Sequence, residues 1–200
     1  MKKRVLLLAV SCKTGGLCPG GIDLDEPSRW IRIVKDDGQA GAVQGYEIDF
    51  GKPLDIIEFD GRAMPQGKQI ENWVIDNISC KVIKSYDPNE TIKVLDWAYQ
   101  KYSYNDFWGN YKPFLNEQEF NAVNVPSESI LKVSDIDIYK NNFNKWKIDF
   151  KWQKARFKIK GVSMTDPDFY NNDSVHIDNA YIIISIPKEI DDWINPNTGE

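Results

Sequence analysis

Hydrophobic residues gather in many short stretches along the chain, and most of these stretches are bounded by glycine, proline, asparagine or aspartate. Short apolar or alternating runs with such boundaries are typical of β-strands. The first run is apolar at successive positions, which predicts a strand that is buried on both faces. We interpret the glycine-rich residues 13–22 that follow it as a turn. The predicted strands are residues 3–11, 30–34, 54–59, 78–86, 129–133, 136–139, 145–152, 154–160 and 181–186.

A single helix is predicted near the middle of the chain. Asp87 can cap its N-terminus, Pro88 suits the first helical position, and Glu90 follows three residues after the cap. The residues from 103 to 126 show no clear period, and we interpret them as an irregular connection. The apolar face of the predicted helix consists of Ile92, Leu95, Tyr99 and Tyr102.

Many short strands with one helix between two strand-rich halves favour a mainly β fold of two small barrels over a sheet built from βαβ units. We therefore predict three regions. Residues 1–86 form a first barrel, residues 87–125 form the helix and an irregular connection, and residues 126–200 form a second barrel.

The composition is that of a folded globular protein. The chain has 200 residues, of which 42% are apolar and 28% are charged, and its seven Trp, nine Tyr and nine Phe supply ample apolar surface for a core. The formal net charge of −5 excludes a uniformly basic coat for nucleic acid, but it leaves room for a local basic patch.

The cysteine count and the hydropathy pattern favour a cytoplasmic protein that is not in a membrane. Three cysteines are an odd number, which favours a reducing compartment over a disulfide framework. No apolar run approaches the ~20 residues of a membrane span. Three cations precede the apolar residues 5–10, as in a signal peptide, but this run is shorter than the ~7–15 apolar residues expected of one. We therefore favour a buried strand over an export signal.

Residues 140–160 form a basic and aromatic stretch. Eight cations and one acid give it a charge of +7, so the remaining residues carry −12. Between residues 145 and 152 aromatic and aliphatic side chains alternate with charged ones, and this alternation changes parity after Gln153. A bulge or bend at Gln153 in one long strand would keep the cations on one side of the sheet. Such a surface could follow a phosphate backbone, or it could be an ordinary solvated face.

The glycine-rich segment could turn backbone amides toward an anion, although it lacks the order of residues of a P-loop. Taken together, a series of short motifs along the chain resembles the dual OB-containing domain family. The motifs in the first half are Ser11-Cys12-Lys13, Gly15-Gly16, Cys18, Gly20-Gly21-Ile22-Asp23, Arg29-Trp30-Ile31-Arg32, Asp55-Ile56-Ile57-Glu58, Gln69, Glu71 and Asn72, and those in the second half are Ala155-Arg156-Phe157 and Thr165-Asp166-Pro167.

The resemblance implies a mainly β fold of two small OB-like barrels joined by a helix-containing connection. It also implies a prokaryotic protein associated with defence against invading genetic elements, with recognition of a nucleic acid or a nucleotide-like ligand as its role. The sequence departs from the family pattern at Ile33 and Ile70, where the family tends to have proline, and in the shortened segment between Phe157 and Thr165.

Candidate ligand-binding residues come from these motifs and from the basic stretch. Arg29 and Arg32 offer planar two-pronged donors beside the glycine segment. Trp30 could stack on a base or simply fill a barrel. The polar side chains at 69–72 could read base edges, or they could bind the backbone of their own loop. The full set of candidates is Lys13, Gly15, Gly16, Arg29, Trp30, Arg32, Gln69, Glu71, Asn72, Lys147, Arg156, Lys158, Thr165 and Asp166.

Catalytic and metal chemistry have weaker sequence support. His176 is the only histidine, the cysteines lack the close pairs of a structural zinc site, and no histidine lies near Cys18 in sequence. Acidic clusters at 23–26, 36–37 and 166–168 could hold Mg²⁺, but aspartates are also common in turns. We therefore expect a binding module without catalytic residues, metal or cofactor. Two alternatives remain open, namely a protein-interaction subunit of a larger complex and an enzyme that acts on nucleotides.

Overall fold

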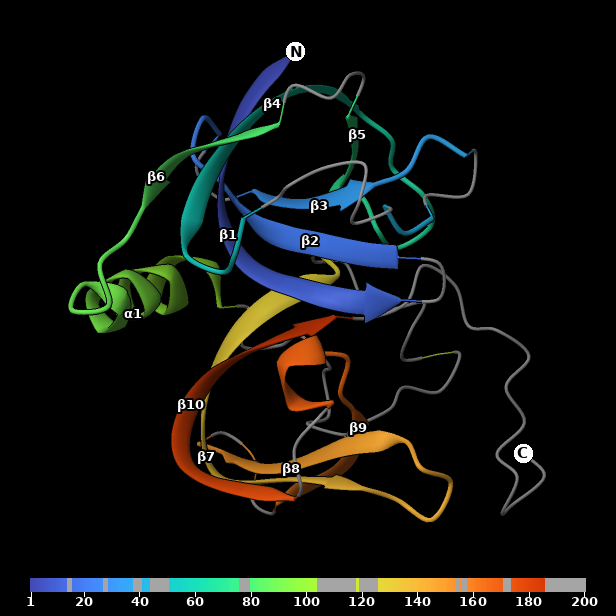
Figure 1. The fold of residues 1–200 in the computed structure, drawn as a ribbon, viewed down its shortest axis with the longest axis vertical. Helices are drawn as coiled ribbons and strands as arrows, with labels where there is room; N and C mark the ends of the chain where they lie inside the picture. The colour runs from blue at the N-terminus through green and yellow to red at the C-terminus, as the bar shows by residue number, and fades with distance from the viewer. Residues whose placement is uncertain are drawn as a thin grey trace.

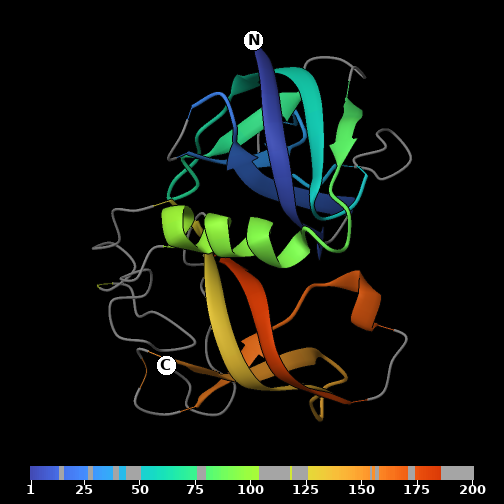
Figure 2. The same ribbon diagram turned by 90° about the vertical axis from the view of Figure 1, so that its left-hand side faces the viewer.

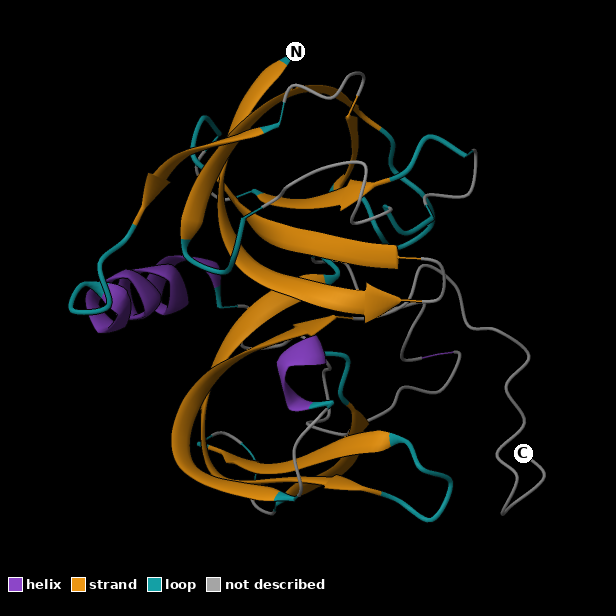
Figure 3. Ribbon diagram, viewed as in Figure 1, coloured by secondary structure: helices purple, strands orange, loops and turns teal. Residues whose placement is uncertain are grey.

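The computed structural model describes residues 1–13, 16–26, 29–37, 41–43, 51–75, 80–103, 118, 126–153, 155, 158–170 and 174–185. As Figures 1 and 3 show, these residues form a strand-rich upper half and a strand-rich lower half, and helix α1 lies beside their junction. The mainly β fold predicted from the sequence is therefore confirmed. Neither of the described helical segments combines the length and the apolarity that a membrane crossing requires.

The first half is a closed five-stranded barrel. Its strands follow the order β1-β2-β3-β5-β4, and β4 pairs with β1 to close the ring. The sixth strand, β6, pairs with residues 55–58 of β4, whereas β5 pairs with residues 61–63. Among the strand pairs that the structure describes in this half, only that of β3 with β5 is parallel. The strands are β1 (Lys2–Lys13), β2 (Gly16–Asp23), β3 (Trp30–Val34), β4 (Asp55–Ala63), β5 (Asn72–Ile75) and β6 (Lys81–Ser85).

The two faces of β1 contribute to different apolar cores. Val5 and Leu7 point into the barrel with residues such as Phe59 and Trp73. Leu6 and Leu8 point outward into a second core. Because successive side chains of a strand alternate between its faces, an unbroken apolar run is what this double burial requires. The prediction of a first strand buried on both faces is confirmed.

The glycine-rich segment is a strand and not the predicted turn. Residues 16–23 form β2, which pairs along its length with β1. A Cβ atom on Gly21 would lie 2.1 Å from the backbone oxygen of Leu6, and one on Gly20 would lie 2.6 Å from a carboxylate oxygen of Glu128. These glycines therefore permit close approach of neighbouring groups, which is a common reason for glycine within a strand.

Helix α1 (Thr91–Tyr102) begins later than the capping pattern suggests. The carboxylate of Asp87 accepts a hydrogen bond from the amide of Asn89 at 2.8 Å, and this forms a turn before the helix. Ile92 is 61% exposed, so its place on the predicted apolar face is wrong, whereas Tyr102 is 3% exposed as expected.

One apolar core joins the helix to both halves. Ala98 of α1 packs with Leu6 and Trp30 of the barrel and with Ile130 of the second half. Figure 2 shows α1 lying across the junction between the two halves. The helix therefore fills the corner between the barrel and the second sheet.

The second half contains a four-stranded antiparallel sheet in the order β10-β7-β8-β9. Its core contains Ile138, Phe150 and Trp152, and the buried positions of β8 confirm the alternation seen in the sequence. The elements are β7 (Glu128–Lys140), β8 (Trp146–Trp152), β9 (Ile159–Ser163), the short 3₁₀ helix η1 (Pro167–Phe169) and β10 (Val175–Ser185).

Two strand predictions in this half need correction. The segments 129–133 and 136–139 belong to one strand, β7, in which Asp135 has a left-handed φ of 50° where the pairing with β8 is irregular. Residues 145–160 are not one long bent strand, because β8 and β9 pair antiparallel as a hairpin. A turn that includes a hydrogen bond from the amide of Ala155 to the carbonyl of Trp152 ends β8.

Candidate functional site

A cavity of about 720 Å³ lies between the barrel and the apolar face of the second sheet. The barrel contributes Leu8, Cys12, Arg32 and Gln69 to its lining. The opposite wall is apolar and includes Ile138, Ile148, Phe150 and Ile182. A concave, largely apolar space with a few polar groups is the usual form of a small-molecule site.

The segment after β9 closes one side of the cavity. The amide of Cys12 at the end of β1 donates a hydrogen bond to the carbonyl of Thr165 at 2.8 Å, so this segment is held against the barrel. Asp166 then caps η1 by accepting a hydrogen bond from the amide of Asp168 at 3.0 Å, and Pro167 takes the first helical position. This local sequence is typical of a helix start, and it fixes Asp166 at the wall of the cavity.

Asp166 combines enclosure with access. The residue is exposed to solvent, yet burial among neighbouring atoms raises the pKa of its carboxyl group. Both observations fit a side chain on the wall of an open cavity, where protein surrounds the group but small molecules still reach it.

Arg32 belongs to a buried polar cluster at the barrel side of the cavity. Its guanidinium donates a hydrogen bond to the hydroxyl of Ser127 at 2.9 Å. It also lies 3.4 Å from Glu128 and 3.7 Å from Glu71. The hydroxyl of Ser127 in turn donates to Glu71. The cluster thus ties β3 and the residue before β5 to the start of β7.

The cluster contains more acid than base. Burial is the main reason that the pKa of Glu128 is raised to about 7; the positive charge of Arg32 opposes this shift and the negative charge of Glu71 adds to it. The carboxylate of Glu128 rests against Gly20 of β2, where any side chain would collide with it. Arg32 is therefore already neutralised by the protein.

The comparison with protein families extends over both halves. Residues 3–194 match the family described as the dual OB-containing domain. The chain belongs to that family. The closed barrel with its second sheet agrees with such a domain, and membership suggests a binding module. No curated protein and no solved structure shows significant similarity to the chain.

Four of the candidate residues of this dual OB-containing domain line the cavity. They are Arg32, Gln69, Thr165 and Asp166. They come from both halves of the chain and lie far apart in sequence, so only the tertiary structure brings them together.

Three other candidates are buried in polar or apolar surroundings. Glu71 belongs to the Arg32 cluster, and Asn72 is fully buried beside Gln69. Trp30 is also fully buried, in the core shared by the barrel, α1 and β7. Of its two interpretations, filling a core is therefore the one that its burial supports.

The remaining candidates lie away from the cavity or outside the description. Arg29 pairs with Glu26 at 2.6 Å on the surface. Gly16 starts β2, and the neighbouring Leu17 uses its amide to bond Val43. The side chain of Lys13, the whole of Gly15 and the whole of Arg156 lie outside the described residues.

Three described cations of the basic stretch have partners on the second sheet. Lys158 pairs with Asp135 at 3.1 Å and also with Asp137, and Lys151 pairs with Asp135 at 2.7 Å. Lys147 donates a hydrogen bond to the hydroxyl of Ser163. The expected gathering of free positive charge is therefore wrong for Lys151 and Lys158.

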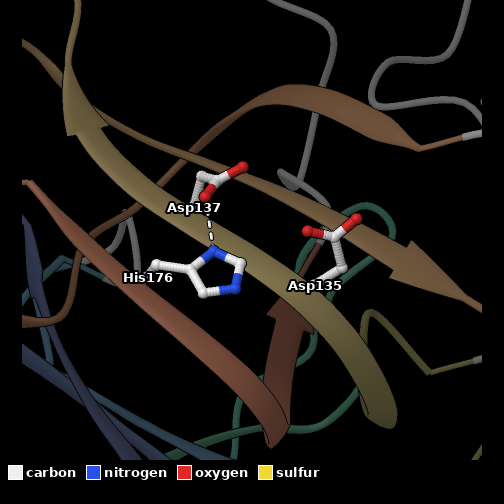
Figure 4. A group of neighbouring side chains, drawn as sticks. All are labelled: Asp135, Asp137 and His176. Carbon is white, nitrogen blue, oxygen red and sulfur yellow. Dashed lines mark hydrogen bonds and ion pairs between the residues drawn. The ribbon is translucent and has the colours of Figure 1, made fainter.

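Asp135, Asp137 and His176 place three possible metal-ligand atoms within 4.8 Å of one another. Figure 4 shows the three side chains close together on the second sheet. The ammonium of Lys158 already supplies positive charge to both aspartates. The imidazole of His176 lies 2.7 Å from Asp137, and this hydrogen bond raises the pKa of the histidine. We therefore assign the group as an ion-pair cluster on the sheet surface, and sequence reasoning missed it because Asp137 lies on a different strand.

The acidic cluster at residues 23–26 is also structural. Lys3 is 1% exposed and its ammonium lies 2.7 Å from Asp23 and 2.6 Å from Glu26. The carboxylate of Asp23 accepts hydrogen bonds from the amides of Asp25 and Glu26. These contacts support the turn interpretation of this cluster.

Proposed function

We propose that this dual OB-containing domain is a binding module that takes the base or nucleoside part of a nucleotide-like ligand into the cavity between its two halves. The observation that carries the proposal is the convergence of Arg32, Gln69, Thr165 and Asp166 on one cavity. Its volume of about 720 Å³ falls within the ~300–1,000 Å³ typical of small-molecule sites.

The charges around the cavity favour a base over a phosphate chain. Arg32 is the one cation among the described lining residues, and the buried acids Glu71 and Glu128 already lie 3.7 Å and 3.4 Å from its guanidinium. A polyphosphate would bring several negative charges to a site where the described residues offer no further cation. The apolar wall, with partly exposed side chains such as Val162 and Ile182, instead suits the faces of a planar heterocycle.

Isothermal titration calorimetry with nucleobases, nucleosides, nucleotides and short oligonucleotides tests this proposal. We expect saturable binding of at least one nucleoside, with an affinity that changes little between low and high salt. A phosphate-tracking interface would instead lose affinity steeply as salt rises. The family resemblance implies a role in prokaryotic defence, and the nucleoside-bearing molecule that binds best would indicate what this role is.

Two matched variants on β10 locate the site. Ala180 lines the cavity, and Asn179 is its exposed neighbour in the sequence. We expect Ala180→Phe to fill the cavity and abolish binding, and Asn179→Phe to leave binding unchanged. Thermal melting shows whether both variants fold. Binding that survives in a folded Ala180→Phe variant, or no binding of any probe to the unaltered protein, would overturn the proposal and leave a protein partner as the next hypothesis.

A further inference from the structure

The most informative polar residue that lines the cavity is Asp166. One of its oxygens accepts the amide of Asp168 at 3.0 Å, and the backbone of the preceding residue is bonded to Cys12. Hydrogen bonds to the residue before Asp166 and to its own side chain therefore hold Asp166 in place. No ion pair joins Asp166 to a cation within the part of the chain that the structure describes.

The titratable groups around Asp166 do not compensate its charge. The charge of Asp166 contributes to the raised pKa values of the Cys12 thiol and the Tyr170 hydroxyl, although burial is the main cause in both cases. Burial is the main cause of the raised pKa of Asp166; the hydrogen bond from the amide of Asp168 lowers this pKa, and the negative charge of Asp168 raises it. Among the described residues, the titratable groups that interact with Asp166 are the Cys12 thiol, the Tyr170 hydroxyl and Asp168, and none of them carries a positive charge.

A carboxylate in such surroundings is best satisfied by donors that a ligand brings. It has about four lone-pair directions, of which the amide of Asp168 uses one, so both oxygens can still accept hydrogen bonds. Two parallel N–H donors match the two oxygens, and hydrogen bonds to an ionised acceptor are stronger than neutral ones.

We propose that Asp166 selects a guanine-type base, which is a heterocycle that carries a ring N–H beside an exocyclic amino group. This inference rests on the proposed function and names the ligand of the same cavity. Guanine presents two adjacent donors on one edge. Adenine and cytosine place an acceptor beside their amino group, and uracil places carbonyl oxygens on both sides of its ring N–H, so each of them sets an acceptor against the carboxylate.

The pair of guanosine and inosine tests the inference directly, because inosine lacks only the exocyclic amino group. We expect calorimetry to show guanosine binding roughly 10- to 100-fold more tightly than inosine, the range for one hydrogen bond to a charged group. Adenosine and uridine serve as further probes and should bind more weakly than guanosine.

The variant Asp166→Asn keeps the shape of the side chain and its ability to cap η1, but it replaces one acceptor oxygen by a donor. We expect it to bind guanosine roughly 10- to 100-fold more weakly and to lose the preference over inosine. The matched control Asp168→Asn removes the neighbouring charge and should keep the preference. Melting temperatures confirm that both variants are folded.

The outcomes separate the two proposals. Nucleoside binding without a preference for guanosine, or a preference that persists in folded Asp166→Asn, would overturn the role of Asp166 and leave the cavity as a nucleoside site. Absence of binding of every nucleoside would overturn the proposed function itself.

Discussion

Replacing Glu128 by glutamine removes an ionisable group from the buried cluster that joins the barrel to the second sheet. The residue is 6% exposed, and its carboxyl group contacts Arg32 and the backbone at Gly20. Glutamine has nearly the same shape and resembles the protonated form of glutamate. The substitution therefore changes the charge while the packing stays close to that of the original protein.

The pKa of Glu128 determines the size and sign of the effect. Burial raises this pKa from 4.5 to about 7, so between these values the folded protein keeps a proton that the unfolded chain has released. The unfolded state then binds fewer protons, and the free energy of unfolding falls as the pH rises toward 7. At about 1.4 kcal/mol for each pKa unit, the full loss is about 3 kcal/mol, and about 2 kcal/mol of it lies above pH 5.5.

Urea denaturation followed by tryptophan fluorescence at pH 5.5 to 8.5 measures this effect. We expect the free energy of unfolding of the unaltered protein to fall by about 2 kcal/mol relative to that of Glu128→Gln as the pH rises from 5.5 to 8.5. The control is Glu58→Gln, because hydrogen bonds to Lys81 and Lys2 lower the pKa of Glu58, which therefore titrates below the range. If the stabilities of Glu128→Gln and the unaltered protein run parallel with pH, Glu128 is not held protonated and the reasoning about the cluster is refuted.

Three further predictions test other parts of the structure. Gly21→Ala should lower the free energy of unfolding by about 3 kcal/mol in urea denaturation, since its methyl group would meet the backbone oxygen of Leu6; a neutral effect would show that β1 and β2 do not approach closely. Asp137→Asn should lower the pKa of His176 toward its ordinary value, which an NMR titration resolves because the chain has one histidine; an unchanged pKa would contradict the hydrogen bond. Ile92→Lys should change the unfolding free energy by no more than about 0.5 kcal/mol, because the residue is 61% exposed, and a large loss would mean that this side of α1 is covered.

Features that depend on neighbouring residues were predictable from the sequence. The alternation in β8 follows directly from the geometry of a strand, and the apolar run of β1 follows from its position between two cores. The glycines of β2 misled the prediction because glycine permits both turns and close approach, and only the positions of Leu6 and Glu128 distinguish these two causes.

Features that depend on distant residues were not predictable. The four-residue strand β5 is specified by its parallel pairing with β3. Arg32 is a candidate anion ligand by its chemistry, but its partner Ser127 lies 95 residues away. Ion pairing of Lys158 likewise depends on the fold of β7. The family motifs nevertheless identified Arg32, Gln69, Thr165 and Asp166, which the structure places around one cavity.

The apolar core that Trp30 shares with Ala98 and Ile130 has a consequence for how the protein melts. Cutting the chain after the first barrel would expose Leu6 and Leu8 to water together with the indole of Trp30. Such a fragment would lose the burial that stabilises one face of its own first strand. The two halves should therefore unfold in a single cooperative transition, and the walls of the cavity should keep a fixed separation for as long as the protein remains folded.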